Sequence, residues 1–212
     1  MFLKRIELIS PIDKLTQLDI EITKPLLCLV GDNGIGKSTI LDALREELKI
    51  EDQSYLKRRD LKKHFKFTWN NPPSNPLAHD THADNKKFAG SFGEDIGAHV
   101  ASMKMSSGEG SLLFLSRVLK KNPDLLILDE LDRGLSVKNQ LILGISLLIK
   151  IKNNVLPQLI VSCHSHSIID LWEKSGDDIL QIFDVEANKT VTWDEYYFTQ
   201  LQKVNKFFGL NP

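Results

Sequence analysis

The stretch that decides the fold is Gly31-Asp-Asn-Gly-Ile-Gly-Lys-Ser-Thr39, which combines three glycines with a lysine and two hydroxyl side chains. It follows the wholly apolar run Leu26–Val30, which is typical of a strand covered on both faces. It leads into residues 37–50, where apolar side chains recur at helical spacing. The stretch fits the pattern G-x-x-x-x-G-K-[ST] at every fixed position, directly between the predicted strand and the predicted helix.

A loop of this composition is suited to binding phosphate. Its glycines let the backbone turn closely, so that N–H groups point inward at anionic oxygens, and the helix adds the positive end of its dipole. Lys37 is expected to neutralise the β- and γ-phosphates, and the Ser38 hydroxyl is expected to bind Mg²⁺. The predicted site for ATP and Mg²⁺ comprises Gly31, Asp32, Asn33, Gly34, Ile35, Gly36, Lys37, Ser38 and Thr39.

Two carboxylates follow the next apolar run. Leu125-Leu-Ile-Leu128 predicts a buried strand, and Asp129 and Glu130 come directly after it, at the edge where ligands of open α/β sheets lie. We expect Asp129 to hold Mg²⁺ through a water and Glu130 to polarise the attacking water as a general base. An acidic pair after a strand is often only a solvated turn, but the phosphate loop ahead of it favours the functional interpretation.

Two further features suit a γ-phosphate. Met105-Ser-Ser-Gly-Glu109 leads into the helix predicted over residues 107–121, and Ser106 is a candidate N-cap. The hydroxyl and backbone N–H groups of this turn, at the start of a helix, are suited to binding a phosphate group. Taken alone, however, the stretch is explained equally well as an ordinary helix cap. A third buried strand, predicted over 159–163, ends at His164, for which we expect a hydrogen bond to the γ-phosphate or the attacking water.

The rest of the chain alternates between strands and helices, which predicts an α/β fold with a mainly parallel sheet and antiparallel N-terminal strands. The helix predicted over 137–152, after the candidate cap Ser136, is apolar on nearly every side and is expected to be buried between layers. Residues 70–85 contain three prolines and predict a loop. The other predicted strands are 1–9, 18–22, 65–69 and 179–185, and the other helices are 168–172 and a segment from Trp193 onward.

Composition excludes several settings. A net charge of −1 provides no positive field that would draw the whole chain to nucleic acid or to an anionic membrane. No apolar stretch approaches the roughly 18 residues of a membrane span, and no signal peptide is evident. Cys28 and Cys163 lie in apolar runs, as expected for buried thiols in a reducing compartment. These features predict a cytoplasmic protein.

In their order along the chain, the segments GDNGIGKST, MSSGEGSLLFL, LLILDELDRGLS and VSCHSHSII resemble the ATP-binding-cassette (ABC) ATPases. They are most similar to the non-transporter branch, the RecF, SMC and OLD-type ATPases, and the resemblance covers residues 26–170. It implies a P-loop NTPase head in a single domain, 1–212, with a shortened signature-helix region at about 50–121. Because the interval from Ser38 to Ser106 is too short for the SMC coiled coil, the head would carry no arm.

The resemblance also implies roles for particular residues. Glu130 matches the catalytic glutamate, Asp129 the Mg²⁺-linked aspartate and His164 the switch histidine, with His166 as a nearby alternative. Two chains, alike or related, would enclose two ATP molecules. The signature turn, which would contact the ATP held by the partner subunit, is formed by Ser106, Ser107, Gly108 and Glu109.

The chain departs from the transporter ATPases at two positions. Ser136 stands where they carry an aspartate in the loop after the carboxylates. No glutamine clearly ends a strand between the phosphate loop and the signature turn, where Asn70 or Asn71 is the candidate replacement and Gln53 lies out of place.

Two polar segments were considered as further sites. A basic stretch is interpreted as a solvated helix face, with a salt-sensitive nucleic-acid contact as the alternative; it contains Lys57, Arg58, Arg59, Lys62, Lys63 and Lys66. A second segment offers residue types that bind metals, but loops of this composition usually bind none; it contains His79, Asp80, His82 and Asp84.

These observations together predict an Mg²⁺-dependent ATPase that works as a dimerising switch, in which ATP bridges two heads and hydrolysis opens them. The resemblance implies a setting in DNA maintenance or in prokaryotic defence or counter-defence, with a separate effector protein. The alternatives are the cytoplasmic ATPase subunit of a membrane ABC transporter and a non-hydrolysing, ATP-dependent scaffold.

Overall fold

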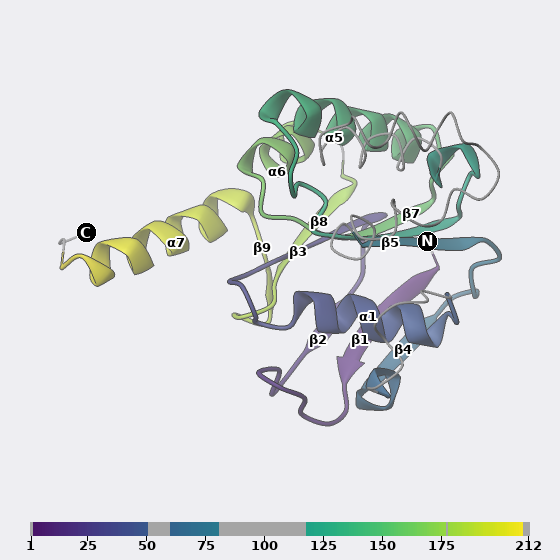
Figure 1. The fold of residues 1–212 in the computed structure, drawn as a ribbon, viewed down its shortest axis with the longest axis horizontal. Helices are drawn as coiled ribbons and strands as arrows, with labels where there is room; N and C mark the ends of the chain where they lie inside the picture. Colours follow the sequence, from purple (N-terminus) through teal and green to yellow (C-terminus); the bar gives the residue numbers. More distant parts are fainter. Residues whose placement is uncertain (1, 51–59, 81–117, 177, 210–212) are drawn as a thin grey trace, which may run out of the picture.

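The computed structural model describes residues 2–50, 60–80, 118–176 and 178–209 (Figure 1). Strands and helices alternate along most of this chain, as the sequence predicts for an α/β fold. The strands are β1 Leu3–Leu8, β2 Asp19–Glu21, β3 Leu26–Val30, β4 Phe65–Trp69, β5 Pro76–Asp80, β6 Leu125–Asp129, β7 Gln158–Ser162, β8 Leu180–Asp184 and β9 Lys189–Val191. The helices are α1 Lys37–Glu47, η2 Leu61–His64 (a 3₁₀ turn), α5 Val137–Lys152, α6 His166–Glu173 and α7 Trp193–Phe207.

The larger sheet has the strand order β5-β6-β7-β3-β8-β9 and is parallel except for the β8–β9 pair. Every residue of β3, β6 and β7 is buried, because helices cover both faces of the sheet, which is why their sequences are continuously apolar. These three strands are neighbours and run the same way. The segments that follow them, with the phosphate loop, the two carboxylates and His164, therefore emerge side by side at one edge.

A smaller antiparallel sheet with the order β2-β1-β4 confirms the expected antiparallel N-terminal part. Helix α1 lies between the two sheets, and α5 and α6 cover the opposite face of the larger sheet (Figure 1). One core cluster joins α1 to both sheets through Leu27, Ile40, Leu44 and Ile6. Burial of apolar side chains on both faces of the larger sheet thus holds the strand ends of the site in place.

The buried side chain of Gln158, at the start of β7, links the two sheets. Its Oε1 accepts hydrogen bonds from the backbone N–H groups of Phe2 and Leu3, both at 2.9 Å, and its Nε2 donates to the carbonyl of Leu3 at 3.0 Å. Because all of these partners are backbone groups, the amide fixes the start of β1 against β7.

The prediction of a loop over residues 70–85 is wrong for Pro76–Asp80, which form the parallel strand β5 beside β6. Proline lacks a backbone N–H and is usually excluded from strands. Pro76, however, is the first residue of an edge strand, the position in a sheet where a missing donor costs least.

Helix α5 has the predicted bounds, and the Asn139 N–H donates to the Oγ of its cap Ser136 at 3.4 Å. The expectation that this helix is buried between layers is wrong. Leu143 and Leu147 face the core, whereas Val137 and Ile149 have exposed fractions of 60% and 51%. Apolar residues therefore extend around α5 well beyond the side that packs on the sheet.

The C-terminal part contains a strand that the sequence does not predict. Strand β9 pairs antiparallel with β8 and leads into α7, whose first turn carries a capping box between Thr192 and Glu195. Helix α7 projects from the body of the molecule (Figure 1). Among the described residues, no helix combines the length and the apolar character that crossing a membrane requires.

Candidate nucleotide-binding site

The loop of residues 31–36 joins β3 to α1 and has the backbone form that its glycines permit. Gly31, Gly34 and Gly36 have φ values of 137°, 76° and 113°, which side-chain-bearing residues rarely adopt. A Cβ atom at Gly36 would also lie only 2.5 Å from the Cγ of Leu15. Gly36 is the N-cap of α1 and supplies no capping side chain, so the first N–H groups of the helix are available for an anion.

The Lys37 side chain folds back into this loop. Its Nζ donates to the carbonyl oxygens of Gly31 at 2.7 Å and Asp32 at 3.0 Å. Burial lowers the pKa of Lys37, although the carboxylates of Asp129 and Asp32 act in the opposite direction. A largely dehydrated ammonium group is therefore held where the sequence predicts the phosphates to lie.

A cavity of about 390 Å³ opens beside the loop. It brings together residues that follow β3, β6 and β7, as the strand order requires. Its lining is formed by Asp13, Lys14, Asn33, Gly34, Gly36, Lys37, Ser38, Thr39, Glu130 and His164. Of the predicted loop residues, Gly31, Asp32 and Ile35 are not among the lining residues and face neighbouring parts of the chain instead.

Ser162, at the end of β7, connects the two predicted carboxylates. Its hydroxyl donates to the carboxylate of the buried Asp129 and accepts a hydrogen bond from the Glu130 backbone N–H at 2.8 Å. The sequence alone does not predict this role of Ser162; the available clue is a hydroxyl group near the end of an otherwise apolar run. A single buried side chain thus sets the position of one carboxylate relative to the other.

Glu130 occupies an uncommon backbone conformation, with φ of 49°. Its carboxylate lines the cavity and its Oε2 accepts a hydrogen bond from Arg133 Nη1 at 2.6 Å. Arg133 lies three residues further along the same turn, which a backbone hydrogen bond between these two residues closes. The side chain proposed to act on water is therefore anchored by its own turn.

His164 also reaches the cavity, and its backbone N–H donates to Asp132 Oδ1 at 3.0 Å. Burial, followed by the Lys37 ammonium, lowers the pKa of His164 below its ordinary value of 6.5. The imidazole is consequently neutral at neutral pH, with one nitrogen that donates and one that accepts.

The alternative histidine, His166, lies elsewhere. Its ring makes edge contacts with Trp193 and Tyr197, each at a centroid distance of 5.3 Å. These contacts direct the ring toward α7, and the residue is not part of the cavity lining. The geometry favours His164 over His166 as the histidine of this site.

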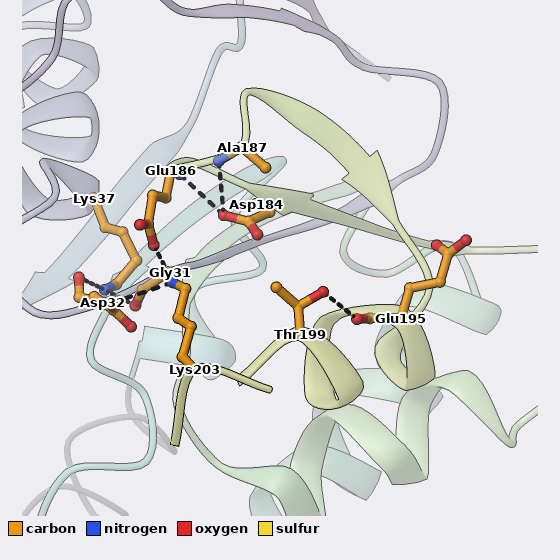
Figure 2. A network of polar contacts seen from close by, with 9 residues as sticks. All are labelled: Gly31, Asp32, Lys37, Asp184, Glu186, Ala187, Glu195, Thr199 and Lys203. Atoms are coloured by element: carbon orange, nitrogen blue, oxygen red, sulfur yellow. Dashed lines mark hydrogen bonds and ion pairs between the residues drawn. The ribbon is translucent and has the colours of Figure 1, made fainter. Parts of the chain in front are cut away.

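Helix α7 braces the first half of the phosphate loop (Figure 2). Lys203 Nζ lies 2.6 Å from Glu186 Oε2 and 3.4 Å from Asp32 Oδ2. Burial, with the nearby carboxylates of Asp184 and Asp32, raises the pKa of Tyr196 to about 12, and a hydrogen bond with the Gly31 backbone acts against this rise. The contact could not be predicted from the sequence, because more than 160 residues separate Lys203 from the loop.

Several predicted residues lie outside the described part of the chain. These are the signature turn Ser106, Ser107, Gly108 and Glu109, together with Gln53, Lys57, Arg58, Arg59, His82 and Asp84. Asn70 and Asn71 are exposed after β4 and do not line the cavity. Lys66 pairs with Glu7 at 3.3 Å, and Lys63 lies 3.9 Å from Asp60. Within the described residues, no group of three or more potential metal-binding side chains is found.

The residues of the cavity fit a triphosphate with Mg²⁺. Lys37 provides a donor for anionic oxygens, and the N-cap Gly36 has no side chain that could bond the first N–H groups of α1. Ser38 lines the cavity, and the buried Asp129 directly precedes Glu130. An oxygen-only pair of this kind suits Mg²⁺, which keeps several of its waters.

Comparison with known proteins identifies the family of this chain. The family described as ABC transporter matches residues 16–132, which is more than half of the chain. A zinc import ATP-binding protein, ZnuC of Acinetobacter baylyi, is 28% identical over 138 residues, covering 60% of this chain and 53% of that protein. The chain thus spans about half the length of this curated relative.

Solved structures share the fold at low sequence identity. CbiO1 of Clostridium perfringens, part of an ABC transporter complex, has a TM-score of 0.55 and 15% identity, with 94% of each chain covered. The SMC head domain of Thermotoga maritima has a TM-score of 0.51 and 14% identity, covering 86% of this chain and 94% of that one. The fold is therefore common to transporter and non-transporter heads. By the family match and the geometry of its phosphate loop, the chain belongs to the ABC transporter family as an ATP-binding domain, and domains of this family bind ATP with Mg²⁺.

Proposed function

We propose that this chain hydrolyses ATP, and that ATP holds two such heads together until hydrolysis releases them. The observation that carries the proposal is the meeting of Lys37, Ser38, Glu130 and His164 around one cavity. These residues come from three different segments of the chain, and the strand order β6-β7-β3 brings them together. A site that only bound nucleotide would not require an acidic side chain and an imidazole in the lining of the same cavity.

Each side chain has a separate task. The first N–H groups of α1 and Lys37 bind phosphate oxygens and reduce their charge. Ser38 and Asp129 would hold Mg²⁺, and the metal would supply stabilisation of the charge that develops on the phosphate oxygens. Glu130 accepts a hydrogen bond from the attacking water and orients it, while the neutral His164 donates to the γ-phosphate.

The direct test is phosphate release by the wild-type chain and by Glu130→Gln in ATP and Mg²⁺. The amide keeps the size of the carboxylate but is a poor base, so we expect release to fall by at least about 100-fold with ATP affinity nearly unchanged. Glu47→Gln, at the exposed end of α1, is the matched control and should behave as wild type. Undiminished release by Glu130→Gln would exclude Glu130 as the base.

The setting that the motifs support is a switch in DNA maintenance or in prokaryotic defence, in which the paired heads control an effector protein. In this arrangement the turn 106–109 of one head contacts the ATP bound to the other. Two sequence features support this setting over a transporter. They are the Ser-Ser-Gly-Glu sequence of that turn and Ser136, which follows the carboxylates where transporter ATPases carry an aspartate.

A second candidate is the ATPase subunit of a membrane transporter. It is favoured by the likeness to ZnuC, whose name describes zinc import, and to CbiO1, which is part of a transporter complex. Affinity purification from the native host distinguishes the two: an integral membrane protein in the complex supports the transporter, and a soluble effector or DNA supports the switch. Tight ATP binding without phosphate release would instead indicate a scaffold.

A further inference from the structure

The connection between β1 and β2 forms a tight turn with a fixed tip. Ile12 and Leu15 exchange two backbone hydrogen bonds, from Ile12 N–H to Leu15 O at 3.0 Å and from Leu15 N–H to Ile12 O at 2.9 Å. Asp13 and Lys14 occupy the tip, and Asp13 has φ of 50°. The two hydrogen bonds set the direction in which the tip residues leave the backbone.

This turn is seated on the phosphate loop. Leu15 is only 3% exposed, and three of its side-chain carbons lie within 3.0 Å of the position that a Cβ at Gly36 would take. The side chain of Leu15 thus packs directly against Gly36 of the loop. The tip residues Asp13 and Lys14 are therefore joined to a buried side chain that contacts the phosphate loop.

Lys14 lies beside the phosphate loop and lines the cavity. Its Nζ lies 3.7 Å from the position that a Cβ at Gly34 would take, and its side chain lines the same cavity as Lys37 and Glu130. In the described parts of the chain, no carboxylate forms an ion pair with this ammonium group. Lys37, by contrast, lies inside the loop on two backbone carbonyls.

We propose that Lys14 is a second phosphate-binding lysine, so that the turn 12–15 of the antiparallel sheet supplies part of the nucleotide site. An ammonium group in the cavity lining attracts anionic phosphate oxygens, in addition to the charge that Lys37 provides. The inference rests on ATP occupying the phosphate loop, as in the proposed function, but it does not require hydrolysis.

The test measures the affinity of the full chain for a fluorescent ATP analogue in Mg²⁺, at two salt concentrations. We expect Lys14→Ala to weaken binding about five- to tenfold and to make the affinity less sensitive to salt, because an exposed charge interaction is lost. Lys14→Arg keeps the charge and should stay within about twofold of wild type. Lys4→Ala removes an exposed lysine from β1 of the same sheet and should also stay within about twofold.

Two results would overturn the inference. If Lys14→Ala binds like wild type, the ammonium does not contact the nucleotide. If Lys14→Arg weakens binding as much as Lys14→Ala, the effect comes from the shape of the turn rather than from the charge.

Failure of the Lys14 proposal can be distinguished from failure of the proposed function. Wild-type binding without phosphate release would contradict hydrolysis and leave Lys14 testable by affinity. Lys37→Ala serves as the reference for loss of the phosphate loop, and its binding should fall well below that of Lys14→Ala. If Lys37→Ala kept wild-type affinity, the nucleotide would not occupy this loop, and the role of Lys14 would fall with it.

Discussion

Ser162 positions residues of the site although its own side chain does not line the cavity. Its hydroxyl donates to Asp129 and accepts from the Glu130 N–H, inside a strand whose residues are all buried. Water has little access there to replace these hydrogen bonds. The relative position of the two carboxylates is thus a property of β7.

Replacing Ser162 with alanine should therefore affect both stability and chemistry. Loss of two buried hydrogen bonds should lower the free energy of unfolding by about 1–3 kcal/mol, measured by urea denaturation. Phosphate release should fall by about tenfold or more, with ATP affinity less affected. Ser146→Ala on α5, whose hydroxyl donates to the exposed turn at Ile142, is the control and should change neither. Equal effects from both variants would contradict this role.

Residues of the phosphate loop could be predicted because their chemistry and their spacing lie within one short segment. The positions of Lys14 and Ser162 could not be predicted, since each depends on contacts between different elements of the fold. The roles of Asp129, Glu130 and His164 remain predictions, although the structure brings Glu130 and His164 to one cavity and places Asp129 directly before Glu130. Those of Ser106 and its neighbours lie outside the described residues.

At the scale of the element, α7 is attached to the body unevenly. Trp193 is buried at its start and Tyr196 lies against Gly31, whereas the second half is tied by Lys203 to Glu186 and Asp32. Exposed ion pairs contribute little to global stability, typically below about 1 kcal/mol. Their local effect on a projecting helix is larger than their effect on the whole fold.

We therefore expect Lys203→Ala to accelerate amide hydrogen exchange at residues 203–207 while residues 196–199 keep their protection. The melting temperature should change by no more than a few degrees. Lys206→Ala removes an exposed lysine from the same turn of the helix and should leave the exchange pattern unchanged. If residues 203–207 exchange no faster than residues 196–199 in both variants, Lys203 does not anchor the second half of the helix.

The two errors at this scale have different physical origins. The loop prediction at Pro76–Asp80 treated proline as a barrier to any strand, but an edge position tolerates it. For α5, the apolar residues on all sides gave no indication of which side packs on the sheet. The buried strands were predictable because their continuous apolar runs have few other stable environments.

At the scale of the whole molecule, the proposed function requires that two chains associate when ATP is bound. Glu130→Gln should bind ATP and Mg²⁺ without hydrolysing it, and so should accumulate as a dimer in size-exclusion chromatography with light scattering. The same variant in ADP should elute as a monomer, because the bridging γ-phosphate is missing. Adding Lys37→Ala to Glu130→Gln should abolish the dimer. A Glu130→Gln chain that stays monomeric in ATP contradicts the two-headed arrangement.

Strand β7 has a polar contact at each of its ends. At one end, Gln158 is hydrogen-bonded to the backbone of Phe2 and Leu3. At the other end, Ser162 is hydrogen-bonded to Asp129 and to the backbone of Glu130. A hydrogen-bonded strand in the middle of a sheet resists stretching, so β7 keeps the distance between these two contacts nearly constant. A displacement of the start of β1 would therefore be transmitted along β7 to the two carboxylates, which would couple the antiparallel sheet to the reaction centre.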